Sequence, residues 1–246
     1  MNVISAIIIA RNEASRISGC IKSVAWADEI IIVDNGSTDE TAKIAQKFKT
    51  IVIEQKIHDF ARIRDIGAMR AKGKWLLYID ADEVATEELR NEVQKIVSSD
   101  LGINAYFIPR QNYYLGKLWP TRDGMVRLIR KNALVRWEGI LHEHAVVKGE
   151  TGILKSNFIH DTHRTLEEMV AKTNEWSVFE AILRLRSGHP PVVGWRLLRV
   201  MMTAFIHSYI TEGGWKAGTV GLIESIYQAF SIFITYAKLW EMQKSI

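Results

Sequence analysis

Four short apolar runs, separated by stretches with helical spacing, constrain the fold of this chain more than any other feature. The runs cover residues 3–10, 29–34, 50–54 and 74–80 and are rich in β-branched and large apolar side chains. Runs that are apolar on both faces are typical of strands buried in a mostly parallel sheet. The alternation of strand and helix therefore predicts a doubly wound α/β fold for residues 1–100.

The stretches between these runs carry helix signals. Ser37, followed three residues later by Glu40, has the spacing of a capping box and predicts a helix through about Phe48. Residues 60–73 place apolar side chains at helical spacing and stop at a glycine. Thr86 is placed to cap a further helix. The apolar face of that helix would hold Leu89, Val93, Ile96 and Val97.

The chain changes character twice after residue 100. Strand and hairpin patterns come first, at residues 105–111, 125–131, 144–148 and 153–161. Thereafter the pattern is helical, with a break at residues 189–191 ("HPP") and two further helices over about 192–211 and 216–242. We therefore expect a first domain over residues 1–163, divided near residue 100, and a helical extension over residues 164–246.

The last of these helices has an unusual distribution of polar side chains. They form one narrow stripe on an otherwise apolar helix, consisting of Glu224, Gln228, Ser231, Thr235 and Lys238. The apolar stretch is about 20 residues long, enough to cross a bilayer. The two charges favour a helix that lies in a membrane interface or packs in a bundle, and a place in the protein's own core or in a dimer interface is the alternative. Over residues 178–238, six Lys and Arg residues stand against three acids, which suits an anionic membrane face.

The bulk composition excludes few classes of function. The net charge is +4 and the isoelectric point about 9.1, a bias too weak to indicate nucleic acid but suited to anionic ligands or surfaces. Cys20 is the only cysteine, so no intrachain disulfide can form. The N-terminal apolar run is short and has no basic residue before it, which is typical of a first strand and not of a signal peptide. We expect a cytoplasmic protein without a nucleic-acid partner.

Residues 73–83, "GKWLLYIDADE", place three acids directly after an apolar run. Ligands of open α/β sheets bind beyond the carboxyl ends of the strands, where Asp80, Asp82 and Glu83 are expected to lie. Two carboxylates one residue apart at a strand end can hold a hard divalent cation together with phosphate oxygens. Capping of the next helix, or simple exposure to solvent, is the alternative for an isolated pair of this kind.

The motifs "IIIARNEASRI", "IIIVDNGSTDET" and "ARIRDIGAMRAKGKWLLYIDADE" follow one another in order. In this combination the chain resembles a family 2 glycosyltransferase with the GT-A fold, the fold of the nucleotide-diphospho-sugar transferases. Within the family it is most similar to the branch of lipopolysaccharide inner-core β-glucosyltransferases. The resemblance continues through "EGILHEH", "FIHDTHRTLEEMVAKTNEW" and "TEGGWKAGTVGLIESIYQAF" and so covers nearly the whole chain. It implies a nucleotide-sugar-binding half over residues 1–100 and an acceptor-side half over residues 101–163.

The resemblance also implies an activity. It would be the inverting, metal-dependent transfer of a sugar such as glucose from a nucleoside-diphosphate sugar, a UDP-sugar foremost. The acceptor would be a lipid-linked saccharide such as the lipopolysaccharide core, at the inner face of the cell membrane. A bound Mg²⁺ or Mn²⁺ would neutralise the departing diphosphate. Peripheral membrane attachment through the C-terminal helices is expected, and a homodimer is an open alternative use of those helices.

Residues at the ends of the first two strands are implied in binding the base and ribose of the donor. They are Arg11, Asn12 and Glu13 after the first strand and Asp34 after the second. Each has a structural alternative that the sequence leaves open. Asn12 could cap the helix that follows it, and Asp34 could brace the "NGS" turn.

The family pattern also supplies candidates for the metal and diphosphate. Asp82 would be the direct metal ligand, and Asp80 would ligate less directly or contact the ribose. His160 is a candidate third ligand, although a histidine at a strand end is often only structural. Arg64 lies at the position of the family's "RN" arginine and is implied to face the donor. Asp65 stands where the family usually has Asn and adds a negative charge there.

An inverting transfer needs a base near the acceptor hydroxyl. The family's "HE" motif selects Glu143 in "WEGILHEH", after an expected short strand "GIL". Glu138, in the same segment, is the competing candidate.

Two other enzyme classes share parts of these patterns. "LLYIDADEV" fits the D-x-D-x-[TV] motif of haloacid-dehalogenase-type phosphatases, in which Asp80 would be the nucleophile. That chemistry needs a further acidic pair at a later strand end, which we do not find, and it leaves "IIIVDNGSTDET" unexplained. A zinc hydrolase is the other alternative, and its ligands would be His142, His144, His160 and His163.

Two readings of the same fold remain besides these. A catalytically inactive module that binds glycans or membrane is a non-enzymatic alternative, which donor hydrolysis with Mn²⁺ would separate from an enzyme. A processive polysaccharide synthase is disfavoured, because Ala133 replaces the Gln of the Q-x-x-R-W signature and long flanking transmembrane helices are lacking.

Overall fold

The computed structural model describes residues 3–57, 59–99, 102–139 and 143–245. It divides into two compact units. The first, here called the sheet unit, consists of Met1–Gln111 and Asp123–His160. The second, the helical unit, consists of Asn112–Arg122 and Asp161–Ile246.

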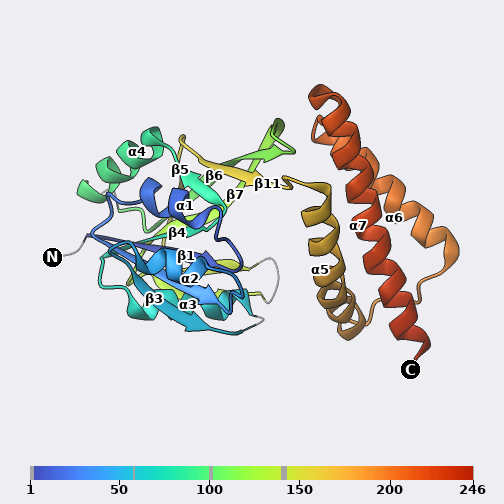
Figure 1. The fold of residues 1–246 in the computed structure, drawn as a ribbon, viewed down its shortest axis with the longest axis horizontal. Coiled ribbons are helices and arrows are strands. Elements are labelled where there is room, and N and C mark those ends of the chain that lie inside the picture. Colours follow the sequence, from blue (N-terminus) through green and yellow to red (C-terminus); the bar gives the residue numbers. More distant parts are fainter. Residues whose placement is uncertain (1–2, 58, 100–101, 140–142, 246) are drawn as a thin grey trace. The chain divides into compact units, whose positions relative to one another are not determined.

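The four apolar runs form the parallel strands at one side of the central sheet (Figure 1). They are β1 (Ile4–Ala10), β2 (Glu29–Asn35), β3 (Ile51–Gln55) and β4 (Trp75–Asp80), in the spatial order β3-β2-β1-β4. β1 pairs in parallel with both β2 and β4, so the chain returns across β1 after β3. The carboxyl ends of all four strands therefore meet at one edge, as the sequence predicted.

The remaining strands extend the sheet and add a hairpin. β7 (Lys117–Arg130) pairs antiparallel with β4 and is followed in the sheet by β6 (Ala105–Tyr114), β11 (Phe158–Thr162) and β5 (Glu83–Ala85). β10 (Thr151–Ile153) pairs in parallel with β6, while β8 (Leu134–Glu138) and β9 (His144–Val147) form a separate antiparallel pair.

The single strand expected over residues 153–161 is two strands in the structure, β10 and β11. Between them, the Lys155 and Ser156 backbone N–H groups donate to the Glu92 carboxylate at 3.0 and 2.8 Å. A side chain of the neighbouring helix thus takes the hydrogen bonds that a continuous strand would have made.

The helices of the sheet unit are α1 (Ile17–Ser23), α2 (Thr41–Gln46), α3 (Phe60–Arg70) and α4 (Glu87–Ser98). Thr86 caps α4 as predicted and accepts from the Leu89 N–H at 3.1 Å. The prediction of a capping box at Ser37 is wrong. α2 begins at Thr41, and its N-cap residue, Glu40, makes no side-chain hydrogen bond to the helix.

The glycine expected to end the third helix has a different function. α3 ends at Arg70, before Gly73. A Cβ at Gly73 would lie 2.6 Å from the Ser5 backbone nitrogen, so this glycine permits a close approach to β1.

Helices cover both faces of the sheet, which confirms the doubly wound fold. Ile8 of β1 packs in an apolar cluster with residues of α1, α2 and α4 on one face of the sheet. Ile7, its neighbour, packs in a second cluster with residues of α3 and β8 on the other face. The alternation follows from the pleat, in which successive side chains point to opposite faces.

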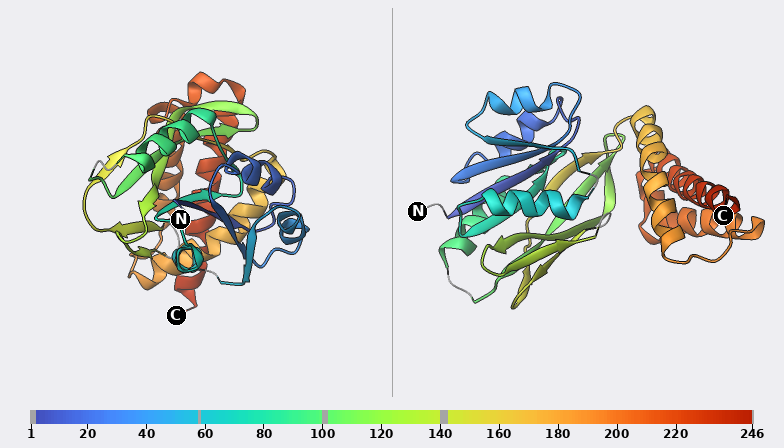
Figure 2. Two further views of the ribbon diagram at one scale, coloured as in Figure 1. Left: turned by 90° about the vertical axis from the view of Figure 1, so that its left-hand side faces the viewer. Right: turned by 90° about the horizontal axis from the view of Figure 1, so that it is seen from below.

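The helical unit contains three long helices, α5 (Leu166–Arg186), α6 (Gly194–Ile206) and α7 (Thr219–Lys244). α6 continues as a π-helical turn, η1 (His207–Thr211), and a 3₁₀ turn, η2 (Gly214–Ala217), precedes α7. α7 packs against both α5 and α6 (Figures 1 and 2).

The polar stripe of α7 faces inward within this unit. Glu224, 1% exposed, lies 3.1 Å from the His163 ring nitrogen Nδ1, and Lys238 donates to the Asn174 carbonyl of α5 at 2.7 Å. Ser231 accepts from the hydroxyl of Thr173, also on α5, at 3.3 Å. The stripe therefore holds α7 to the rest of its own bundle.

Candidate active site

The loops that leave β1 and β2 are tied to each other. Asn12, at a φ of +56°, accepts from the Thr38 N–H at 2.8 Å, and its own N–H donates to the Ser37 hydroxyl at 2.9 Å. Asp34, 3% exposed, accepts from the Ser37 N–H at 3.0 Å and from its hydroxyl at 2.5 Å. Asp34 thus braces the "NGS" turn. Asn12 does not cap α1, whose N-cap residue, Arg16, makes no side-chain cap bond.

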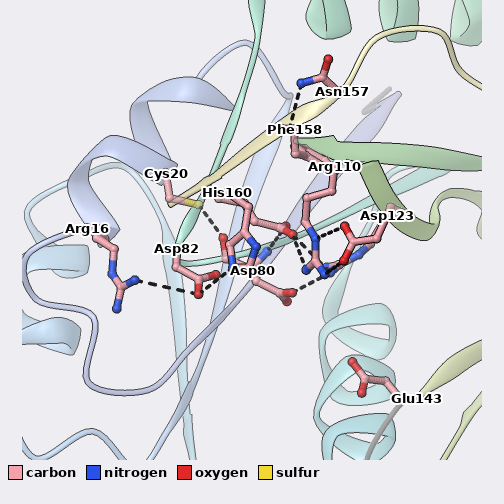
Figure 3. Close-up of polar contacts among 12 residues, drawn as sticks. Arg16, Cys20, Asp80, Asp82, Arg110, Asp123, Glu143, Asn157, Phe158 and His160 are labelled. Atoms are coloured by element: carbon pink, nitrogen blue, oxygen red, sulfur yellow. Dashed lines mark hydrogen bonds and ion pairs between the residues drawn. The ribbon is translucent and has the colours of Figure 1, made fainter. Parts of the chain in front are cut away.

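A second chain of contacts runs from the end of β1 toward the acids after β4. Glu13 donates its N–H to the Thr41 hydroxyl at 2.7 Å, and its carboxylate lies 2.5 Å from Arg16 Nε. Arg16 Nη1 in turn lies 3.9 Å from Asp82 Oδ2 (Figure 3). Arg11, at the end of β1, is partly exposed.

Asp80, the last residue of β4, lies between two arginines. Arg64 Nη2 donates to Oδ1 at 2.9 Å and Arg127 Nη2 to Oδ2 at 2.5 Å. Both arginine side chains are 3% exposed. Burial alone would raise the pKa of Asp80, but Arg127 and Arg64 outweigh it and hold that pKa well below its usual range. Asp80 is therefore an ionised, fixed carboxylate.

Glu83, the third acid, is 1% exposed and has a structural function. Its Oε2 accepts from the Asp80 N–H at 2.9 Å. Its Oε1 accepts from Arg110 Nη1 at 3.2 Å and lies 3.5 Å from Arg127. Arg110 is held in turn by the two carboxylate oxygens of Asp123, at 2.9 and 2.7 Å (Figure 3). Burial raises the pKa of Glu83. The negative charge of Asp80 raises it further, and the positive charge of Arg127 lowers it by less than the other two raise it.

Asp82 and His160 form a pair beside this arginine network. His160 lies on β11 directly across from Glu83 on β5, and its Nε2 is 3.2 Å from Asp82 Oδ2 (Figure 3). The His160 side chain is 10% exposed and the Asp82 side chain 18%. Asp80 is not part of this pair, because both its oxygens face arginines. Within the part of the chain that the structure describes, no three His, Cys, Asp or Glu side chains form a group that could hold a metal.

Arg64 joins the strand-end acids to the candidate base. Its Nε and Nη2 atoms lie 2.8 and 2.7 Å from Glu143 Oε1, while Nη2 also contacts Asp80. The guanidinium lies 4.9 Å from the Trp137 ring centroid, which restricts its orientation further. Glu143, 11% exposed, is thereby fixed in the same network as Asp80.

Glu138, the competing base, has other partners. It ends β8, pairs with Arg136, and lies 3.7 Å from His144 Nε2. Its side chain is 39% exposed. The expected "GIL" strand falls partly on residues 140–142, which lie outside the described residues.

Asp65 takes no part in the network. It accepts the Trp137 N–H at 3.1 Å and so ties α3 to β8. Burial raises its pKa, and the Trp137 hydrogen bond opposes that increase. The acid in place of the family's usual amide therefore keeps a defined hydrogen bond.

The described histidines do not converge on a zinc site. His144 lies near Glu138, His160 contacts Asp82 and His163 contacts Glu224. The fourth proposed ligand, His142, lies outside the described residues. Each of these three histidines thus has a carboxylate partner of its own.

Three arginines of the network were not predicted as site residues, Arg16, Arg110 and Arg127. Arg127 had one local signal, since it interrupts the apolar run "MVRLI" in an expected strand. A cation inside such a run must have a buried partner.

Comparison with known proteins assigns this geometry to a family. Residues 5–149 match the sequence profile of glycosyl transferase family 2. The chain belongs to that family. It is 28% identical to the lipopolysaccharide core biosynthesis glycosyltransferase LpsC of Rhizobium meliloti, over 97% of this chain and 92% of the relative. An uncharacterized glycosyltransferase of Rickettsia prowazekii is also 28% identical, over 98% of this chain and 88% of the relative.

One solved structure supports the same fold. The crystal structure of S. aureus TarS 1-349 in complex with UDP-GlcNAc aligns with a TM-score of 0.51 at 13% identity, over 99% of this chain and 92% of that one. The protein is thus a glycosyltransferase with a GT-A fold and a helical extension, and the phosphatase alternative is wrong.

Proposed function

We propose that the protein is an inverting glycosyltransferase that moves a sugar such as glucose from a nucleoside-diphosphate sugar, a UDP-sugar foremost, to a lipid-linked saccharide. The acceptor would belong to the lipopolysaccharide core, and the transfer would take place at the inner face of the cell membrane. The bridge from Asp80 through Arg64 to Glu143 carries this proposal, because it fixes a carboxylate base beside the strand-end acids. The likeness to LpsC supports the acceptor class.

The donor would bind across the ends of β1, β2 and β4. Arg11, Asn12 and Glu13 would hold the base and ribose together with Asp34. The hydrogen bonds of Asn12 to Ser37 and Thr38 hold the two loops together and would fix the residues that contact the donor. TarS, of similar fold, was crystallised with UDP-GlcNAc, which supports a nucleotide sugar as the donor.

The metal would be held by Asp82 and His160. Their side chains lie within 3.2 Å of each other, and carboxylate and imidazole are ligand types that divalent metal ions accept. An imidazole ligand favours Mn²⁺ over Mg²⁺, which prefers oxygen alone. When bound, such an ion acts as a Lewis acid toward the diphosphate. Asp80 would contribute indirectly, by orienting Arg64 and Arg127 or by contacting the ribose.

Glu143 would be the general base. Arg64 contacts Oε1, and in our proposal Oε2 accepts the proton of the acceptor hydroxyl. The hydroxyl oxygen forms the bond to the anomeric carbon as the bond from that carbon to the diphosphate oxygen breaks. Attack from the side opposite the leaving group inverts the anomeric configuration.

A panel of nucleotide sugars tests the class and the donor together. With Mn²⁺ present, we expect one UDP-sugar to raise the melting temperature of the full chain most, because a ligand at about 100 times its Kd stabilises the folded state by about 2.7 kcal/mol. The Asp82→Asn variant should fold normally and lose the Mn²⁺-dependent part of that shift. A panel in which no nucleotide sugar raises the melting temperature would contradict the proposal.

A further inference from the structure

The helical unit exposes an apolar face on α6 and η1. Its side chains follow one side of the helix at intervals of three and four residues, at Trp195, Leu198, Met202, Ile206 and Ile210. Trp195, Leu198 and Met202 are 60%, 68% and 59% exposed. A surface helix of a water-soluble protein normally turns such a stripe toward its core.

α7, which packs against α6, also exposes apolar side chains. Leu222, Ile226 and Phe230 are exposed at intervals of four residues. They lie on the side of the helix opposite the stripe that contains Glu224 and Lys238, which bonds inward to the rest of the bundle. The polar side of α7 is thus used inside the unit, and its apolar side faces outward. We call the exposed apolar side chains of α6, η1, η2 and α7 the outer face.

The outer face includes three exposed tryptophans, and each has a basic group close to its ring. Arg196 and Arg199 lie 5.6 and 5.5 Å from the Trp195 ring centroid. Lys216 lies 5.4 Å from the Trp215 ring. For Trp240 the partner is Lys244, at 3.9 Å.

Pairs of a tryptophan and a basic side chain suit the headgroup layer of a lipid membrane. Tryptophan rings and basic side chains both concentrate at the level of the headgroups. Over residues 194–245, five basic residues stand against three acids. Of those acids, Glu224 is buried and Glu212 lies 3.3 Å from His207, while Glu241 is exposed. The surplus of positive charge on the exposed surface favours anionic lipids.

The same helix is long enough to cross a membrane, but its contacts favour a different placement. Among the described residues, the stretch Gly214–Lys244 is sufficiently long and apolar to span a bilayer, judged by length and composition alone. Its inward bonds from Glu224 to His163 and from Lys238 to Asn174 hold it in the bundle. Of α7, the exposed apolar side then remains available to lipid.

We propose that the outer face docks on an anionic lipid surface, with α6 and α7 lying in the plane of the headgroups and the three tryptophans inserted among them. This inference deepens the membrane localisation proposed above and rests on that part of the proposed function. A second copy of the chain is the competing occupant, which the experiment below distinguishes.

Vesicle flotation of the full chain tests the proposal. We expect binding to phosphatidylcholine vesicles that contain phosphatidylglycerol to be at least about tenfold stronger than binding to phosphatidylcholine alone. Added salt should weaken it, because the basic groups contribute part of the attraction. The double variant Leu198→Glu/Met202→Glu should lose at least about tenfold of the binding, since it places charge in the apolar layer.

The Met69→Glu variant is a matched control. Met69 is 75% exposed on α3 of the sheet unit, so it undergoes the same chemical change outside the outer face and should bind vesicles like the wild type. Equal binding to both kinds of vesicle, or to neither, would overturn the proposal. So would a wild-type dimer in sedimentation that Leu198→Glu/Met202→Glu dissociates. The melting-temperature shift with a UDP-sugar is measured on each variant, so that failure of lipid docking and failure of donor binding are told apart.

Discussion

At the scale of single residues, the three acids at the end of β4 are tolerated because each is paired with an arginine or a histidine. Asp80 is held by Arg64 and Arg127, Asp82 contacts His160, and Glu83 meets Arg110 and Arg127. An unpaired carboxylate in such a place would cost several kcal/mol or remain protonated. The strand end is therefore a network of compensated charges and not a bare cluster of acids.

Sequence patterns predicted one side of this network and missed the other. The acids follow directly from their place after an apolar run, and His160 was a candidate because of the family resemblance. The arginine partners Arg110 and Arg127 come from β6 and β7, far along the chain. Only the pairing of strands in space brings them to Asp80 and Glu83, and no local spacing encodes that pairing.

The buried arginine between two acids should contribute strongly to stability. We expect Arg127→Gln to lower the free energy of unfolding by about 3 kcal/mol, because it leaves Asp80 and Glu83 without part of their compensation. Arg136→Gln is the matched control, since Arg136 is 58% exposed and pairs with Glu138, and its loss should cost less than about 1 kcal/mol. Urea unfolding of both variants measures the difference, and equal losses would refute this role of Arg127.

At the scale of elements, Glu29 joins the start of β2 to two other segments. Its carboxylate accepts from the Ser5 hydroxyl of β1 at 2.5 Å and from the N–H groups of Lys72 and Gly73 before β4. Burial would raise the pKa of Glu29, but these hydrogen bonds outweigh it and lower the pKa below its usual value. The ionised form is therefore the one that stabilises this edge of the sheet.

This lowered pKa predicts a pH dependence of stability. The contribution of Glu29 is complete above the pKa of the unfolded chain and is lost as the pH falls through the lower pKa of the folded state. Glu29→Gln should unfold about 1 kcal/mol more easily at pH 7, and the gap to the wild type should narrow below about pH 5. Thermal unfolding between pH 7 and pH 3 measures this stability difference. Glu54→Gln, at an exposed position of β3, is the control variant. A gap that stays constant over this range would rule out the ionised carboxylate as the cause.

Elements with a strong periodic signal were predicted well, and those decided by side-chain competition were not. The four parallel strands and the Thr86 cap match the structure. Ser37 fails as a cap because Asp34, three residues earlier, takes its hydroxyl and its N–H. The polar stripe of the last helix was recognised, but its inward direction depends on α5 and could not be predicted from α7 alone.

At the scale of the whole molecule, the proposed active site and the outer face belong to different compact units. The sheet unit contains the whole arginine–carboxylate network from Arg16 to Glu143, and the helical unit contains the outer face with its tryptophan–cation pairs. The family assignment covers residues 5–149, which lie largely in the sheet unit. We therefore expect substitutions in the outer face to weaken lipid docking without changing transfer, and substitutions in the network to do the reverse.

The central claim is that Glu143, fixed by Arg64, is the base of the transfer. The most direct measurement compares kcat and donor Kd for Glu143→Gln and Glu138→Gln, because the amide keeps the shape and cannot accept the proton. We expect Glu143→Gln to lower kcat by about 10²–10⁴ with the donor Kd unchanged, and Glu138→Gln, at an exposed pair, to remain near normal. Full kcat in Glu143→Gln together with a large loss in Glu138→Gln would contradict the claim and move the base to Glu138.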